Sequence, residues 1–395
     1  MKKFAKLCCI GCFIGILFVS AIQTVLSEKE ATSYYENRML AKWPDFTKES
    51  LVSGEYPAAI SAYLKDHFAG REAALRAGTW LNLHVFQKPV VNDVVVQDDI
   101  LLPYLPFEEL PTEESTRKKA EAMADNIAVA AKRTEENGGK YCYVMVPCQY
   151  AMFPEKYPDY LNNRQYRTEL ERKYLKEALA ERGITYVDMG EVFAEQDDPA
   201  KYSSAIDNHY SLQGAFLTYI TIADTLQQEG FTLQVPKDIT FMPVENPYLG
   251  SRDRKLFDLW QSEEQLYQAV FDEEIPFTRM DNGIAVPSEV YQTPETSTEN
   301  VLYGYYMGGD IAETIIQTNR GELPTGLIYG DSFTNAVEVL AYRSFDEMRS
   351  LDFRHYHEKS LDEYLQEYQP DFVICIRDYE SMLSLDGNGK NVQEK

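Results

Sequence analysis

The sequence predicts an α/β protein in which helices cover both faces of a parallel sheet. Helical and strand patterns alternate along the chain beyond residue 99, and such alternation implies parallel strands joined by helical crossovers. Three of the predicted helices stop at a glycine, which is typical of a helix C-terminus. Hydrophobic residues make up 44% of the 395 positions, which is enough for a sizeable core.

Each predicted helix carries apolar residues at intervals of three and four, and each predicted strand is a short apolar run. The helices are expected at 115–136, 164–182, 211–229 and 361–368, with Ser211 as the N-cap of the third. The strands are expected at 141–146, 184–189, 326–329 and 372–376, and a further helix follows the third strand. Residues 231–322 break the alternation, so we expect an insertion or lid there, within an α/β domain of 90–395.

The N-terminus has the composition of a membrane anchor. The first six residues include three lysines, and residues 7–26 are uncharged and largely apolar. About 20 apolar residues can cross a bilayer as a helix, and flanking lysines stay on the cytoplasmic side. We therefore expect a cytoplasmic tail (1–6), a transmembrane signal anchor (7–26), a juxtamembrane helical region (27–89) and an extracytoplasmic main domain in the cell envelope. Secretion after cleavage of a signal peptide is the alternative.

Charge narrows the choice of partners. The formal net charge is −25, which argues against a nucleic-acid partner because phosphate binding needs clustered Lys and Arg. The same charge slightly favours a neutral over an anionic ligand. Three cysteines, Cys142, Cys148 and Cys375, lie outside the apolar stretch, and their odd number argues against a disulfide framework. Cys142 and Cys375 lie in runs typical of buried strands.

A candidate nucleophile follows the strand at 326–329. In open parallel sheets, ligands bind beyond the carboxyl ends of the strands. Gly330-Asp331-Ser332-Phe333 stands at such an end, directly before a helix. A serine on a strand-to-helix turn is raised above the sheet, and its own amide can help to hold an oxyanion. The alternative for Ser332 is a plain helix cap.

A candidate base lies in Asp207-Asn208-His209-Tyr210, just before the helix at 211–229. The chain has only five histidines. An acidic residue two positions before a histidine can orient the imidazole through one ring nitrogen and leave the other for a hydroxyl. The alternative is that Asp207 and His209 only cap the helix.

These motifs carry a family resemblance. Asp207-Asn208-His209-Tyr210 resembles the D-H-H-W or D-T-H-W signature of the DHHW and AlgX/AlgJ-like proteins, in the SGNH hydrolase superfamily, and Gly330-Asp331-Ser332-Phe333 resembles their G-D-S-F block. Glu36-Asn37-Arg38 and the segment from Asp66 to Arg71 resemble the juxtamembrane part of this family. The sequence departs from the signature at Asn208 and Tyr210.

The resemblance implies a flavodoxin-like three-layer α/β/α fold. It implies Ser332 as nucleophile, His209 as base and Asp207 as the residue that orients the base. It also implies transfer of an acyl, usually acetyl, group to or from a cell-surface polysaccharide or exopolysaccharide, beside a membrane-bound O-acyltransferase that supplies the group. No cofactor is expected.

Other residues are candidates for oxyanion or substrate binding. Gly308 and Gly309 could bring their backbone close to a carbonyl, although a simple turn is the favoured reading of this pair. Arg354, Tyr356 and Tyr210 could reach the same site, with an ion-pair role for Arg354 as the alternative. A zinc site at His355 and His357 lacks a convincing set of further ligands, so no metal is expected.

Two other functions stay open. If water replaces the sugar hydroxyl as acceptor, the protein is a carbohydrate esterase or deacetylase. A protein that keeps the fold without turnover would be a polysaccharide-binding scaffold subunit.

Overall fold

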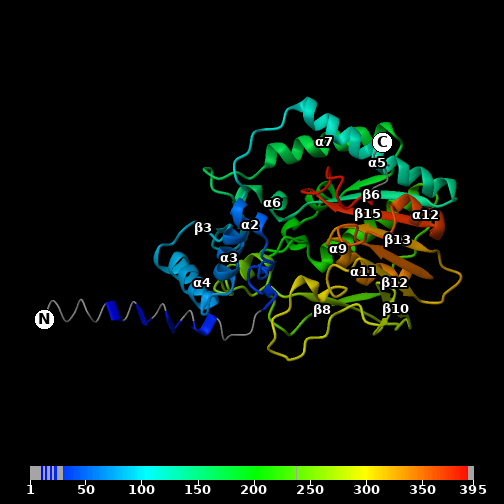
Figure 1. Ribbon diagram of the computed structural model, residues 1–395. Helices are drawn as coiled ribbons and strands as arrows, with labels where there is room; N and C mark the ends of the chain where they lie inside the picture. The colour runs from blue at the N-terminus through cyan, green and yellow to red at the C-terminus, as the bar shows by residue number, and fades with distance from the viewer. Residues whose placement is uncertain are drawn as a thin grey trace. The chain divides into compact units, whose positions relative to one another are not determined.

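The computed structural model describes residues 10–11, 14–15, 18–19, 22–24, 30–236 and 238–389. The chain divides into two compact units. The first contains Met1–Val96 and Asp253–Gln261, and the second contains Gln97–Arg252 and Ser262–Lys395. Figure 1 shows the chain coloured from its N-terminus to its C-terminus.

The second unit is built on one eight-stranded sheet with the order β11-β10-β12-β14-β13-β15-β6-β7. Its strands are β6 (Lys140–Val146), β7 (Tyr186–Asp188), β10 (Thr278–Asp281), β11 (Ile284–Val286), β12 (Glu313–Gln317), β13 (Gly326–Gly330), β14 (Glu347–Leu351) and β15 (Phe372–Asp378). The five strands β14, β13, β15, β6 and β7 are parallel; β6, β7, β13 and β15 were predicted, and β14 was not. The other three pair antiparallel, so the sheet is mixed.

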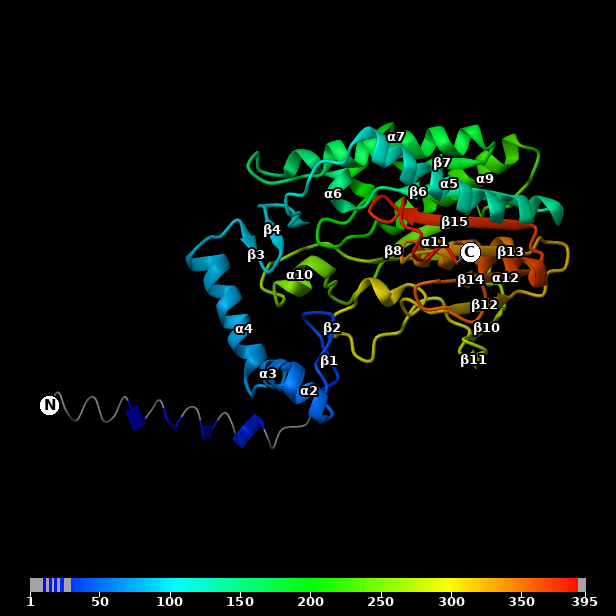
Figure 2. The same ribbon diagram turned by 45° about the horizontal axis from the view of Figure 1, so that its top comes forward.

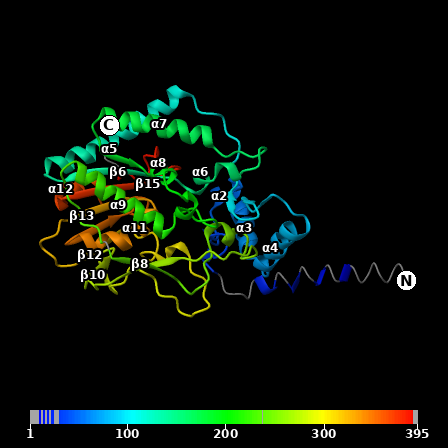
Figure 3. The same ribbon diagram turned by 180° about the vertical axis from the view of Figure 1, so that it is seen from behind.

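Helices cover both faces of this sheet, as Figures 1 and 3 show. One face carries α5 (Glu113–Glu136), α7 (Gln165–Glu181) and α12 (Leu361–Tyr368), and the other carries α9 (Leu212–Gln228) and α11 (Thr334–Ala341). The three-layer α/β/α arrangement is therefore confirmed. Shorter elements are β5 (Leu101–Pro103), α6 (Gln149–Met152), α8 (Met189–Ala194) and helical turns at Pro154–Lys156, Pro199–Tyr202, Tyr303–Tyr305 and Tyr342–Ser344.

Local signals explain where the helices begin. Thr112 accepts the Ser115 N–H at the start of α5, with acidic residues in the first turn. The Ser211 hydroxyl accepts the Gly214 N–H at 3.1 Å, which confirms Ser211 as the N-cap of α9. The buried strands β6, β13 and β15 form the centre of the core.

The segment 231–322, expected as an insertion or lid, takes part in the sheet. Its first strands, β8 (Ile239–Pro243) and β9 (Tyr267–Phe271), form a separate antiparallel pair. The next three, β10 to β12, extend the main sheet, with β12 antiparallel to β14. These strands have three to five residues each, too short to show a clear periodic pattern in the sequence.

The first unit is mainly helical. It contains β1 (Thr32–Ser33), β2 (Arg38–Met39), α2 (Lys48–Ser53), α3 (Glu55–Asp66), α4 (Arg71–Trp80), a π-helical turn at Leu81–Val85, β3 (Val90–Val91) and β4 (Val94–Val96). The helix α10 (Ser251–Lys255) begins with residues of the second unit and ends with residues of the first.

The two motifs of the first unit meet in space. The Arg38 guanidinium binds both carboxylate oxygens of Asp66, at 2.9 and 2.5 Å, and Arg71 binds both oxygens of Glu36. The Ala41 N–H also donates to Asp66 at 2.8 Å. The hydrogen bond from Arg38 holds the pKa of Asp66 well below its usual range. These pairs fix the β1–β2 hairpin onto α3 and α4.

The expected anchor at 7–26 lies largely outside the described residues, and the expected tail at 1–6 lies entirely outside them. Within the part of the chain that the structure describes, no helix combines the length and apolar character needed to span a membrane. Cys142, Cys148 and Cys375 are buried and free, and burial raises the pKa of the Cys142 thiol to about 12.

Candidate active site

Ser332 lies on the sharp turn between β13 and α11. The turn passes so close to β15 that a Cβ at Gly330 would lie 1.9 Å from the Ile376 carbonyl oxygen. Only glycine fits there, which explains the glycine of this motif. Ser332 itself stands between the end of the strand and the first turn of the helix, half-buried.

The side chain of Asp331 holds this turn in place through three hydrogen bonds. Its carboxylate accepts the Phe333 N–H at 3.0 Å, the Asp378 N–H at 2.9 Å and the Ser381 hydroxyl at 2.7 Å. Burial, together with the charge of Asp331, raises the pKa of Asp378 to about 7. Asp331 thus ties the turn to the end of β15 just before Ser332.

Asp207 and His209 lie on the loop that leads into α9. The Nδ1 atom of His209 is 2.5 Å from Oδ1 of Asp207, which also accepts the His209 N–H at 3.1 Å. The other carboxylate oxygen accepts the Ser251 N–H at 2.5 Å. Burial would raise the pKa of Asp207, but the His209 imidazole and these N–H groups outweigh burial and lower it.

The structure brings the three predicted residues together. His209 Nε2 lies 2.7 Å from Ser332 Oγ, across 123 positions of sequence. One imidazole nitrogen therefore faces a carboxylate and the other a serine hydroxyl, which is the geometry that activates a serine for nucleophilic attack.

Tyr303 packs flat on His209, and sequence reasoning missed it. The two rings have centroids 3.6 Å apart and an interplanar angle of 3°. The Phe333 ring packs near the same imidazole, with ring centroids 5.0 Å apart. Tyr303 lies in the segment expected as an insertion, and no motif in the sequence marked it.

The loop that carries His209 is braced by neighbours that sequence reasoning also missed. The Arg252 guanidinium donates to the Asn208 side-chain oxygen at 2.9 Å, and the Gln149 N–H donates to the Asn208 carbonyl at 3.3 Å. A Cβ at Gly250 would lie 2.3 Å from the Ile206 carbonyl oxygen, so glycine permits the close approach of the two segments. The departure at Asn208 thus supplies an acceptor for Arg252.

The remaining predicted residues lie in different settings. Tyr210 is buried, packs on Phe333 and donates its hydroxyl to the Phe333 carbonyl, so it supports the residue next to Ser332. The Tyr356 ring packs between Phe353 and Tyr364. Arg354 forms ion pairs with Asp310 at 3.1 Å and Asp352 at 2.5 Å.

Two of the backbone amides predicted to hold an oxyanion are those of Ser332 and Gly308. Among the described residues, neither N–H has an acceptor. The Gly309 N–H donates to the Tyr306 carbonyl at 3.2 Å, so it is engaged within its own loop. Gly308 and Gly309 both have positive φ, at +82° and +95°, which is the backbone conformation of a tight turn.

A group of possible metal ligands lies next to Arg354. Ligand atoms of Asp310, Asp352 and His355 lie within 4.8 Å of one another. The Arg354 guanidinium already pairs with both carboxylates and offsets one of their two negative charges. We assign no metal to this group.

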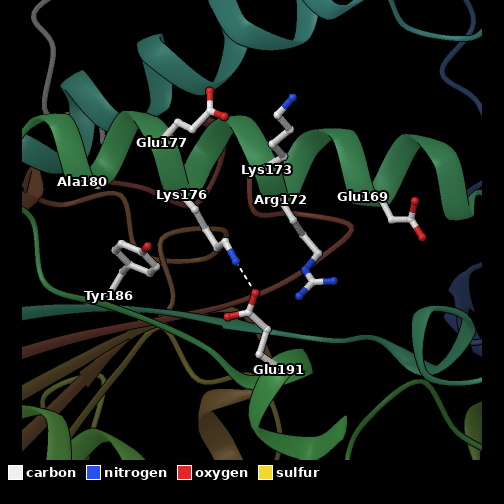
Figure 4. Close-up of a pocket in the computed structure, with 8 residues that line it drawn as sticks. All are labelled: Glu169, Arg172, Lys173, Lys176, Glu177, Ala180, Tyr186 and Glu191. Atoms are coloured by element: carbon white, nitrogen blue, oxygen red, sulfur yellow. Dashed lines mark hydrogen bonds and ion pairs between the residues drawn. The ribbon is translucent and has the colours of Figure 1, made fainter.

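A hollow of about 460 Å³ lies along α7, opposite β7 and α8. Figure 4 shows its charged side chains, with Arg172 and Lys176 pointing toward Glu191 and with Lys173 and Glu177 on the other side of the helix. Arg172 binds Asp188 at 2.7 Å and Lys176 binds Glu191. Because Arg172 and Lys176 already form ion pairs with acidic residues, we assign no ligand to this hollow.

Part of the chain is similar to a known protein family. Residues 105–272 match the family model of the SGNH hydrolase-like domain of the acetyltransferase AlgX. The resemblance to AlgX-like SGNH proteins is confirmed. The AlgX-like match includes Asp207 and His209 and ends before Ser332.

Solved structures with the same fold include PatB1 of Bacillus cereus, at 21% identity and a TM-score of 0.62 over 73% of this chain and 96% of that one. PatB1 with a sulfonyl adduct matches at 19% identity and a TM-score of 0.60, over 73% and 95%. A DHHW family protein of Eubacterium siraeum matches at 14% identity and a TM-score of 0.56, over 77% and 97%. No curated protein sequence matches this chain.

Proposed function

We propose that this protein transfers an acyl group, in particular acetyl, to a cell-surface polysaccharide or exopolysaccharide through an acyl-serine intermediate on Ser332. The observation that carries the proposal is the continuous relay from Asp207 through His209 to Ser332, with contacts of 2.5 and 2.7 Å. Such a relay has one main chemical use, which is to make a serine hydroxyl nucleophilic.

The reaction takes two steps. His209 Nε2 accepts the Ser332 proton while Oγ attacks the donor carbonyl, and the leaving group departs with that proton. The acceptor hydroxyl then loses its proton to His209 and attacks the acyl carbon. The bond from that carbon to Oγ breaks, and Oγ takes the proton back from His209, which restores Ser332. Asp207 keeps Nδ1 protonated and stabilises the imidazolium in both steps, and the Ser332 and Gly308 amides are the candidate donors to the oxyanion.

The acetyl group is the acyl group best supported. The family model that matches residues 105–272 is described by the acetyltransferase AlgX.

The compartment and partners follow from the sequence expectations. A domain anchored by residues 7–26 would meet its acceptor outside the cytoplasm and receive acetyl groups from a membrane-bound O-acyltransferase. A net charge of −25 favours a neutral acceptor.

Transfer is tested by incubating the full chain with a chromogenic acetyl ester and a neutral oligosaccharide. We expect the oligosaccharide to gain the mass of acetyl groups with the parent protein and to stay unchanged with Ser332→Ala. The control Ser384→Ala, a serine outside the relay, should behave as the parent does.

The same assay separates the alternatives. Ester turnover without acetylated oligosaccharide would favour the carbohydrate esterase. Binding of the oligosaccharide without turnover, equal in the parent and in Ser332→Ala, would favour the scaffold subunit.

A further inference from the structure

The helices of the first unit leave their apolar side chains uncovered. No residue of α2 or α3 is buried, and α4 buries only Thr79. Large apolar side chains exposed on these helices include Val52, Leu64 and Trp80. An exposed apolar surface of this extent usually marks a contact with a partner or a membrane.

A groove of about 700 Å³ runs between α3 and α4, which lie next to each other in Figure 2. Its apolar lining is Pro57, Ile60, Leu64, Phe68, Ala74 and Leu75, with Lys65 and Arg71 beside them. Leu64 and Phe68 each expose almost half of their surface. The groove is therefore open and apolar, with cationic side chains at its edge.

The chain itself indicates what covers the groove. Thr24, near the end of the apolar stretch 7–26, accepts the Ala69 N–H at 3.0 Å through its hydroxyl. Ala69 lies in the loop between α3 and α4, next to the groove residue Phe68. A bilayer that contained the apolar stretch would therefore begin beside the groove.

The positions of the tryptophans also indicate that a bilayer covers the groove. The chain has three tryptophans, and all of them lie in the first unit, at Trp43, Trp80 and Trp260. Trp43 is 60% exposed and packs on Tyr63 of α3, and Trp80 is 47% exposed at the end of α4. Tryptophan is enriched at the interface between a membrane and water, where its ring is partly apolar and partly solvated.

We propose that the groove between α3 and α4 docks onto the surface of the lipid bilayer, with Leu64 and Phe68 inserted at the boundary between headgroups and acyl chains. The apolar lining gains free energy by leaving water, and Lys65 faces the lipid phosphates. Docking adds a second contact to the expected anchor. It holds the first unit against the membrane and does not depend on the proposed transferase activity.

Lipid contact is tested with a tryptophan placed in the groove. Phe68→Trp is made in a chain in which Trp43, Trp80 and Trp260 are replaced by Phe, and the full chain is reconstituted into phosphatidylcholine vesicles with plain or brominated acyl chains. We expect the emission of the new tryptophan to be lower in the brominated than in the plain vesicles, because the groove residues lie at the level of the acyl chains. Equal emission in the two vesicles would overturn the proposal.

The matched control is Phe107→Trp in the same background, because Phe107 is a strongly exposed phenylalanine of the second unit. It should be quenched by aqueous iodide and not by brominated lipid. Leu64→Asp should weaken the lipid quenching of Phe68→Trp, whereas Ala62→Asp, on the same helix but outside the groove, should not. Protection of Phe68→Trp that grows with protein concentration, without lipid quenching, would assign the groove to a second copy of the chain and overturn the proposal.

Discussion

The imidazole of His209 lies flat on the phenol ring of Tyr303, with ring centroids 3.6 Å apart. This stacking sets the plane of the imidazole. In that plane, Nδ1 faces Asp207 and Nε2 faces Ser332. The ring also shields one face of the imidazole from water, so the proton relay depends on a residue that takes no part in proton transfer.

Replacing Tyr303 tests this dependence. Tyr303→Leu removes the flat surface and should lower kcat for acetyl-ester hydrolysis about tenfold with little change in KM, because a misaligned base costs about 1.4 kcal/mol of transition-state stabilisation. Tyr303→Phe keeps the ring and should retain parental kcat, since the buried Tyr303 hydroxyl has no partner among the described residues. A parental kcat for Tyr303→Leu would show that stacking does not position His209.

Gly250 allows the close approach through which the Ser251 N–H reaches the Asp207 carboxylate. In Gly250→Ala the added methyl would meet the Ile206 carbonyl and push apart the segments that join Asp207 to the Ser251 N–H. We expect a loss of about 1–3 kcal/mol in the free energy of unfolding and at least a tenfold loss of esterase activity. Thermal unfolding and ester turnover measure the two effects.

Gly321→Ala is the control for Gly250→Ala, because nothing lies within 4 Å of a Cβ at Gly321 and its φ is not positive. This variant should match the parent in both assays. Equal behaviour of the two glycine variants would contradict a specific role for the close approach at Gly250.

Glu264 makes stability depend on pH. Its side chain accepts the Ala205 N–H at 2.8 Å, and burial raises its pKa to about 7. Because the folded state holds this proton more tightly than the unfolded state, whose carboxyl has its ordinary pKa of 4.5, stability should fall as the pH rises from about 4.5 to 7. Glu264→Gln cannot ionise, so its free energy of unfolding should exceed that of the parent by up to about 3 kcal/mol at pH 8 and match it at pH 4.

Urea unfolding at several pH values measures this difference. Glu263→Gln, an exposed neighbour, is the control and should follow the parent at every pH. A Glu264→Gln variant that is less stable than the parent at pH 8 would show that the carboxylate is needed in its charged form.

Local pattern was enough to predict four of the five parallel strands, but not β14. Helix caps such as Ser211 and buried runs such as β6 and β15 depend on nearby sequence, so the layers could be predicted. The strands β10 to β12 could not, because they are short and gain their stability from pairing with β14 and with one another.

The candidate site also combines residues that the sequence predicted with residues that it did not. Asp207, His209 and Ser332 lie in short motifs with recognisable chemistry. Tyr303 contributes a ring face, which any of the chain's many aromatic residues could supply, and Ser251 contributes a backbone N–H, which nearly every residue has; only the folded chain places these two beside His209 and Asp207.

The central claim is that Ser332 carries the acyl group. It is tested most directly by the intact mass of the protein after brief incubation with a chromogenic acetyl ester, followed by peptide mapping. The account predicts one acetyl group on Ser332 in the parent and none in Ser332→Ala, with both proteins folded by circular dichroism. An adduct that persists in Ser332→Ala, or a folded parent that shows neither adduct nor ester turnover, would contradict it.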